Sequence, residues 1–269
     1  MAKAYSTYKT YSVGSDQFEK WAATNYWKDP RYKGNVTAYY KRELVEEFLR
    51  KLIVEDKKPW TIRTYLNGIR FMAREYGVPL EISDDIAPPI REEIPIFVTK
   101  EEVEFLLNNI WDKQYKALIA LLWDTAIRIS EALALNVNDV SFKDNTITLS
   151  KRKGSYVPYV IPFCERTAEI LTDYIEEWKI KIGYPLFPGR RSERLSETTA
   201  IREIRDYGEI YLNKRITSHS FRHGRAIMLR KEGIDITEIA DLLGHKRLET
   251  TRRYARITGV HLKNLPKAF

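Results

Sequence analysis

The chain has 269 residues, of which 43% are hydrophobic and 30% are charged, a composition typical of a folded globular protein and not of a disordered one. Basic residues outnumber acidic ones by 45 to 37, and the formal net charge of +8 favours an anionic partner, nucleic acid first. The lone Cys164 excludes an internal disulfide and a cysteine-cluster zinc site. Since no signal peptide and no run of about 18 apolar residues is recognisable, we expect no membrane span and a cytoplasmic protein.

The first third of the chain is predicted to be helical. Residues 36–55 read VTAYYKRELVEEFLRKLIVE and repeat their apolar side chains at a helical rather than a strand period. Residues 59–77, PWTIRTYLNGIRFMAREYG, predict a second helix. Aromatic side chains alternate with Arg and Lys along both segments, and a small helical bundle with one solvated face explains this at least as well as a binding surface does.

A linker is predicted at residues 84–96. Acidic residues and prolines crowd the surrounding stretch, VPLEISDDIAPPIREEIP, and do not continue a helix. We therefore expect a helical domain at residues 1–83 and a second domain at residues 97–269. Both parts are net positive, and two basic domains joined by a flexible strap can close around a rod-shaped polyanion.

The second domain is predicted to be mainly helical with one β-hairpin. Thr99 and Glu102 have the spacing of a capping box, and KALIALLWDTA, which follows, is apolar enough for a buried helix. The segments NTITLSKR and YVPYVIP predict two strands joined at Lys153 and Gly154. Further helices are expected at residues 165–182, 196–212, 218–232, 235–243 and 248–256. The fold class is thus mainly α with a small antiparallel β-sheet.

Arg128 and the segment HSFRH, residues 219–223, are the first candidates for chemistry. Arg128 lies between apolar segments, and it either forms a structural ion pair with Glu131 or holds a phosphate with its planar guanidinium. His219 and Arg222 are three residues apart and share a helix face. His219 and His223 have a zinc-ligand spacing, but the glutamate of an H-E-x-x-H motif is absent, so we expect no metal.

The stretch GHKRLETTRRY contains His245 and Tyr254. On one continuous helix at about 100° per residue, nine positions turn through about 900° and place the two side chains on opposite faces. The two residues share a site only if the backbone breaks between them. We therefore predict that the preceding helix stops at Gly244 and that a second begins near Leu248.

Taken in order, these segments resemble the tyrosine recombinase, or phage integrase, family. TAIRISEALAL resembles the family's T-G-x-R-x-S-E-x-x-x-L segment, SKRKG its K-G hairpin, HSFRH its H-x-L-R-H box and LLGHKRLETTRRY its L-G-H-x-x-x-x-T-T-x-x-Y box. The four segments span about residues 125–254, whereas residues 1–83 resemble the family's core-binding domain in position and character only. The resemblance implies a site-specific DNA recombinase that needs no cofactor, no metal and no ATP.

The resemblance also implies a role for each site residue. Tyr254 is expected to attack a DNA phosphodiester, leaving a 3′-phosphotyrosyl bond and a free 5′-hydroxyl. The other implied residues are Arg128 and Arg222 for the phosphate oxygens, Lys153 as general acid, His219 as acceptor of the tyrosine proton, His245 as donor to a phosphate oxygen, and Glu131, which orients the arginine and histidine side chains. The implied partners are double-stranded DNA with specific recombination sites and further copies of the chain, as a homotetramer or paired dimers.

The sequence departs from the family pattern at a few positions. Ala126 replaces the usual glycine before Arg128. Tyr156 and Pro158 follow the K-G turn where charged residues are common, so Lys151 is an alternative to Lys153 as general acid. Because proline removes a ladder donor, the second strand of the hairpin is expected at a sheet edge or at a bulge.

Two other functions stay open at this point. A type IB topoisomerase shares the tyrosine and much of the site, but relaxes supercoils as a monomer. A DNA-binding regulator without catalysis belongs to another class, although every expected catalytic residue type is present. Basic stretches at 151–153, 190–194 and 202–205 are either phosphate contacts or solvated faces, and the tail at 255–269 is expected to dock on a neighbour or on its own domain.

Overall fold

The structure is a computed structural model of the chain. It describes residues 5–32, 35–90, 94–149, 158–190 and 192–244, together with residues 251 and 254. The chain divides into two compact units, Met1–Glu93 and Ile94–Phe269, and each unit is described by itself. The division falls inside the segment where the linker is expected, while the roles expected of the two domains remain predictions. No described helix is long and apolar enough to cross a lipid bilayer.

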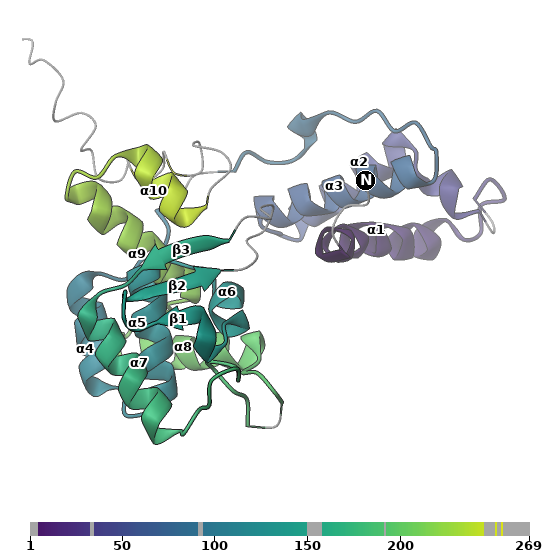
Figure 1. The fold of residues 1–269 in the computed structure, drawn as a ribbon. Helices are drawn as coiled ribbons and strands as arrows, with labels where there is room; N and C mark the ends of the chain where they lie inside the picture. Colours follow the sequence, from purple (N-terminus) through teal and green to yellow (C-terminus); the bar gives the residue numbers. More distant parts are fainter. Residues whose placement is uncertain are drawn as a thin grey trace, which may run out of the picture. The chain divides into compact units, whose positions relative to one another are not determined.

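Three helices that pack on one another build the N-terminal unit: α1 (Tyr5–Tyr26), α2 (Arg42–Val54) and α3 (Pro59–Glu75) (Figure 1). Their shared core is rich in aromatic side chains. The Phe18 ring lies 5.4 Å from the Tyr40 ring and 5.6 Å from the Phe48 ring, both in edge-to-face geometry, which is favourable for aromatic pairs. These aromatic residues of the N-terminal third therefore form a core, as expected for a helical bundle.

The apolar period of residues 36–55 predicts one continuous helix, but the structure has two separate elements there. The segment forms a 3₁₀ turn, η1 (Val36–Tyr39), and then α2. Asn35 caps the turn by accepting a hydrogen bond from Thr37 N at 3.1 Å, and Lys41 is extended (φ −107°, ψ 146°) just before α2 begins. Tyr40 is buried at this interruption, so the apolar period reports a continuous core rather than a continuous helix.

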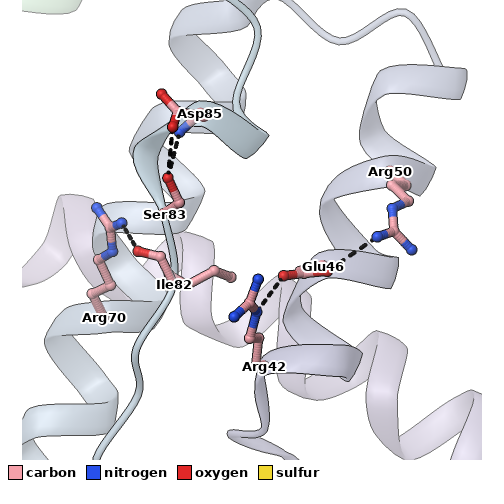
Figure 2. A network of polar contacts seen from close by, with 7 residues as sticks. All are labelled: Arg42, Glu46, Arg50, Arg70, Ile82, Ser83 and Asp85. Carbon is pink, nitrogen blue, oxygen red and sulfur yellow. Dashed lines mark hydrogen bonds and ion pairs between the residues drawn. The ribbon is translucent and has the colours of Figure 1, made fainter.

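The beginning of the predicted linker is fastened to the N-terminal unit (Figure 2). Arg70 on α3 donates a hydrogen bond to Ile82 O at 2.5 Å. It also pairs with Asp84 at 2.5 Å. Ser83 caps a short 3₁₀ helix, η2 (Asp84–Ile86), by accepting a hydrogen bond from Asp85 N at 3.2 Å. Ala87 is buried against the aromatic core. The first residues of the segment where the linker is expected are therefore packed in place.

The C-terminal unit is built around α5 (Lys113–Thr125), a helix in which every residue from Ala117 to Leu122 is buried. This confirms the buried helix predicted from KALIALLWDTA. The helices that pack against α5 are α4 (Lys100–Asn109), α6 (Ile129–Ala134), α7 (Glu165–Glu177), α8 (Glu197–Leu212) and α9 (Ser218–Lys231). Helix α10 (Ile236–Leu243) packs on α9 (Figure 1).

Local signals placed most helix ends in this unit correctly. The capping box before α4 is present, since Glu102 N donates to Thr99 Oγ1 at 3.2 Å and Thr99 N donates to Glu102 Oε2 at 2.8 Å. The helix predicted at 165–182 is wrong at its end, because α7 stops at Glu177. Lys179 adopts a positive φ of 51° there, and Ile180 N bonds back to Ile175 O at 3.0 Å, a termination that glycine usually provides.

The sheet has the order β1–β2–β3 and is antiparallel throughout. Strand β1 (Val140–Ser141) was not predicted, because two residues carry too little periodicity to be recognised. Strands β2 (Thr146–Leu149) and β3 (Tyr159–Pro162) confirm the predicted hairpin partners. β3 is an edge strand that begins just after Pro158, as expected from the missing proline donor.

Candidate active site

Arg128 stands between the end of α5 and the start of α6. Its backbone N–H donates to Glu131 Oε2 at 2.8 Å, and its guanidinium donates to Glu131 Oε1 at 2.9 Å. Glu131 is buried, whereas 29% of the Arg128 side chain is exposed. The structural ion pair considered from the sequence therefore exists. Because a guanidinium carries five N–H donors, this pair leaves Arg128 able to bind a phosphate as well.

Arg222, on α9, is buried and joins three helices. Its guanidinium donates hydrogen bonds to the backbone carbonyls of Ala126, at the end of α5, and of Leu243, at the end of α10. These carbonyls belong to helix ends, where the last carbonyls have no partner within the helix. Since Arg128 follows Ala126 by two residues, the bond to Ala126 brings the two arginines into the same region of the unit.

Helix α9 is fixed in place by a close approach to the first residues of the C-terminal unit. Val98 N donates to Ser220 O at 3.1 Å. Gly224 makes this approach possible, because a Cβ at that position would lie 1.9 Å from Val98 O. The helix that carries His219 and Arg222 is thus held between Val98 on one side and the carbonyls of α5 and α10 on the other.

His219 occupies the first turn of α9, one turn before Arg222. Desolvation by the surrounding protein lowers the pKa of His219 below its usual value, and the positive charges of Arg222 and Arg128 lower it further. The ring is therefore neutral at neutral pH, and a neutral imidazole can accept a proton. Because both arginines lower the pKa of His219, the three side chains share one electrostatic environment.

Tyr254 lies close to α9 but contacts a different histidine from the one expected. Its hydroxyl is 2.8 Å from Nδ1 of His223, a hydrogen bond in which the ring tautomer decides which group donates. Tyr254 is 1% exposed. The sequence analysis did not identify His223 as a residue that contacts the tyrosine, and His223 is therefore an additional functional candidate. The signal was available in the second histidine of HSFRH, which was weighed only as a zinc ligand.

A helix break between His245 and Tyr254 was predicted, and the predicted end of the first helix is confirmed. Helix α10 ends at Gly244, which adopts a left-handed conformation with φ 59°. His245 itself and both lysines considered as general acid lie outside the described residues. Of the second helix, expected from about Leu248, only Thr251 and Tyr254 are described, and both are helical. The strand after the predicted lysine turn does reach α10, since the Tyr159 hydroxyl donates to Asp241 O at 2.9 Å.

The basic stretches considered for phosphate contact are partly structural. The Arg194 guanidinium donates to the carbonyls of Leu133, Ala134 and Leu135 at 3.2, 3.0 and 3.0 Å and so caps the end of α6. On α8, Arg202 pairs with Glu203 at 3.0 Å and Arg205 with Asp206 at 2.8 Å. Arg194 is thus committed to the fold, and the two arginines of α8 lie in exposed ion pairs.

Comparison with known proteins shows the family of the chain. A family-wide sequence pattern described as "Phage integrase family" matches residues 97–260, a range that includes every residue of the site. The chain belongs to the phage integrase family of tyrosine recombinases. As an enzyme of this family it cleaves and rejoins DNA, and the assignment confirms the recombinase interpretation over the topoisomerase and the non-catalytic regulator.

One sequence relative agrees with the family assignment, and two solved structures share the fold. The chain is 30% identical to "Tyrosine recombinase XerA" of Pyrococcus furiosus over 220 residues, which cover 80% of this chain and 76% of the relative. A solved structure of "XerH site-specific recombinase bound to palindromic difH substrate: post-cleavage complex" matches 95% of this chain and 77% of that one, with 18% identity and a TM-score of 0.73. A "lambda integrase dimer bound to a COC' core site" matches with a TM-score of 0.58, 16% identity, and coverage of 96% and 79%.

Proposed function

We propose that Tyr254 is the nucleophile with which this recombinase breaks DNA, forming a 3′-phosphotyrosyl bond and releasing a 5′-hydroxyl. A free tyrosine is a weak nucleophile at neutral pH, because its pKa is about 10. The observation that carries the proposal is that α9 contacts both the Arg128 segment and Tyr254. This helix brings Arg222 to the segment that carries Arg128, and one residue later it hydrogen-bonds the Tyr254 hydroxyl through His223.

The two arginines are proposed to bind the non-bridging oxygens of the scissile phosphate. Their positive charges neutralise the extra negative charge of the pentacoordinate transition state, in place of metal ions. Glu131 keeps the Arg128 guanidinium in position through its bond of 2.9 Å. His219, neutral at neutral pH, is proposed to accept the tyrosine proton as the hydroxyl attacks.

Lys153 and His245 complete the proposed site. Lys153 protonates the leaving 5′-oxygen as general acid, with Lys151 as the alternative, and His245 donates a hydrogen bond to a phosphate oxygen. Both roles follow from the match of SKRKG and LLGHKRLETTRRY to the family pattern.

The proposed partner is double-stranded DNA that carries specific recombination sites. Residues 1–83 are proposed to form the core-binding domain and residues 97–269 the catalytic domain, so that the DNA duplex is held by both. Four protomers, or two dimers, pair two duplexes, and the tail at 255–269 is one candidate for the contact between protomers. The exchange serves integration and excision or the resolution of dimeric replicons, in the compartment that holds the DNA, expected to be the cytoplasm.

The nucleophile is tested by trapping covalent protein on DNA. A library of nicked duplexes of randomised sequence lets the cleaved strand lose a short 5′-hydroxyl fragment, so that religation is prevented. Protein that migrates with DNA on a denaturing gel then reports the phosphotyrosyl bond, and sequencing of the trapped duplexes identifies the preferred site. We expect Tyr254→Phe to bind the selected duplex with unchanged affinity and to form no covalent complex.

The matched control is Tyr174→Phe. Tyr174 is a fully buried tyrosine of the same unit that accepts a hydrogen bond from Gln114 and lies in a different core cluster from Tyr254. This variant is expected to trap DNA as the parent protein does. Covalent complex that persists in Tyr254→Phe would show that another residue attacks the phosphate.

A further inference from the structure

The ring of Tyr254 is enclosed in an apolar pocket in the DNA-free protein. The buried residues of this cluster, here called the tyrosine pocket, are Ala126, Ala226, Ile227, Ile239 and Leu243, with Phe97, Leu229 and Leu242 packed against them. They come from the end of α5, from α9, from α10 and from the first residues of the unit. Since Tyr254 is 1% exposed, a water molecule barely reaches the side chain. A DNA phosphodiester, which is much larger, does not reach it in this arrangement.

The hydroxyl end of the ring is held by His223. The Nδ1 atom lies 2.8 Å from the hydroxyl oxygen, and the two ring centroids are 5.8 Å apart. His223 is half-buried, so the pair lies where the tyrosine pocket meets the surface. Loss of the hydrogen bond would leave a buried hydroxyl without this partner, which is unfavourable, so this contact stabilises the enclosed position of the ring.

We propose that His223 is a positioning residue that keeps Tyr254 closed in its pocket until DNA occupies the site. This inference rests on the proposed function, in which Tyr254 is the nucleophile. The enclosed ring must leave its position before the hydroxyl can attack a phosphate. A nucleophile that is closed away in this position does not react before DNA is bound.

Arg222 connects the phosphate site to this closure. Its guanidinium bonds the carbonyls of Ala126 and Leu243, and both residues are walls of the tyrosine pocket. A phosphate that binds Arg222 competes with these carbonyls for the guanidinium, because a phosphate oxygen carries negative charge whereas a carbonyl oxygen offers only a dipole. Binding of the scissile phosphate therefore loosens the walls on two sides of the ring, next to the histidine that holds its hydroxyl.

Chemical nitration of the DNA-free, full-length protein tests the closure without any need for activity. Tetranitromethane modifies accessible tyrosines, and peptide mass spectrometry reports each one separately. Tyr184, 61% exposed, marks the rate of an open tyrosine, and Tyr174, 0% exposed, marks a closed one. We expect Tyr254 to react as slowly as Tyr174. A rate close to that of Tyr184 would overturn the proposal.

Two substitutions of His223 distinguish the effect of its hydrogen bond from the effect of the bulk of its ring. His223→Phe keeps a ring but removes Nδ1, and we expect Tyr254 to become at least about fivefold more reactive. His223→Asn places an amide near the position of Nδ1, and we expect it to restore most of the protection. Tyr174 stays protected in both if the unit is folded. If Tyr254 is equally reactive in both variants, or unchanged in His223→Phe, the hydrogen bond is not what closes the pocket.

The rate of covalent trapping distinguishes a holding role from a chemical one. If His223 only holds the tyrosine, His223→Phe traps the selected duplex at least as fast as the parent protein. If His223 is instead the base that removes the tyrosine proton, trapping slows about 10²- to 10⁴-fold and the proposal is wrong. The outcome is independent of the test of the nucleophile, because nitration of DNA-free protein reports closure even if Tyr254→Phe still traps DNA.

Discussion

Arginine side chains organise both units of the molecule, but their partners differ. In the N-terminal unit, Arg42 and Arg50 pair with Glu46 at 2.7 and 3.0 Å, and Arg70 fastens the chain at Ile82 (Figure 2). The side chains of Arg42 and Arg50 are 66% and 69% exposed. Such pairs contribute little to stability, because water and salt screen them.

In the C-terminal unit the arginines of the site are held by buried groups. Arg222 is 4% exposed and bonds two helix-end carbonyls, and Arg128 is held by a carboxylate that is itself buried. These contacts keep both positive charges in the same region of the unit before a phosphate arrives. We therefore expect that loss of the contacts of Arg128 and Arg222 slows DNA cleavage, whereas loss of the contacts of the N-terminal arginines does not. Three substitutions test this conclusion.

Arg222→Lys is expected to have the largest effect. A lysine keeps the charge but has no planar fork, so it cannot present the paired donors that bond the two carbonyls or two phosphate oxygens. We expect the rate of covalent trapping to fall about 10²- to 10³-fold, as for the loss of one transition-state donor, and the thermal midpoint to fall as well. Arg225→Lys, three residues along the same helix and paired with Asp124 at 3.6 Å, is the matched control and is expected to trap DNA normally.

Glu131→Gln is expected to have an intermediate effect. The amide oxygen can still accept the Arg128 N–H, but the amide nitrogen then faces the guanidinium, and two donors do not bond each other. We expect a loss of stability of about 1–3 kcal/mol and, because Arg128 is no longer held, slower trapping. Stability is measured by urea unfolding and trapping by the gel assay at saturating DNA.

Glu102→Gln controls for the loss of a helix cap. Glu102 also stands at the third position of its helix, bonds the N–H of its capping residue at 2.8 Å and pairs with a cation, Lys214, at 3.0 Å. This variant is expected to lose stability but to keep its trapping rate. Equal slowing of the two variants would mean that Glu131 acts only through the fold.

The elements of this protein were more predictable from the sequence than its contacts were. Helix ends and hairpin partners follow from neighbouring residues, as Thr99 with Glu102 and Gly244 show. The Arg222 bond to Ala126 joins residues 96 apart, and the bond of His223 to Tyr254 joins residues 31 apart. No local pattern encodes such pairs, because they depend on how α5, α9 and α10 pack. The family pattern supplied the residue types of the site, and the packing decides which histidine meets the tyrosine.

Arg70→Gln is expected to have the smallest effect. The glutamine loses the ion pair to Asp84 and the bond to Ile82 O, both at 2.5 Å, and we expect a change in unfolding free energy of at most about 1 kcal/mol. Hydrogen exchange should quicken at the amides of Asp85 and Ala87, since η2 is no longer fastened to α3. Arg42→Gln, which removes only a bond to Glu46 on its own helix, should leave those amides unchanged. Neither variant is expected to alter trapping at saturating DNA, and slowing by Arg70→Gln as large as that by Glu131→Gln would break the distinction between the two kinds of arginine.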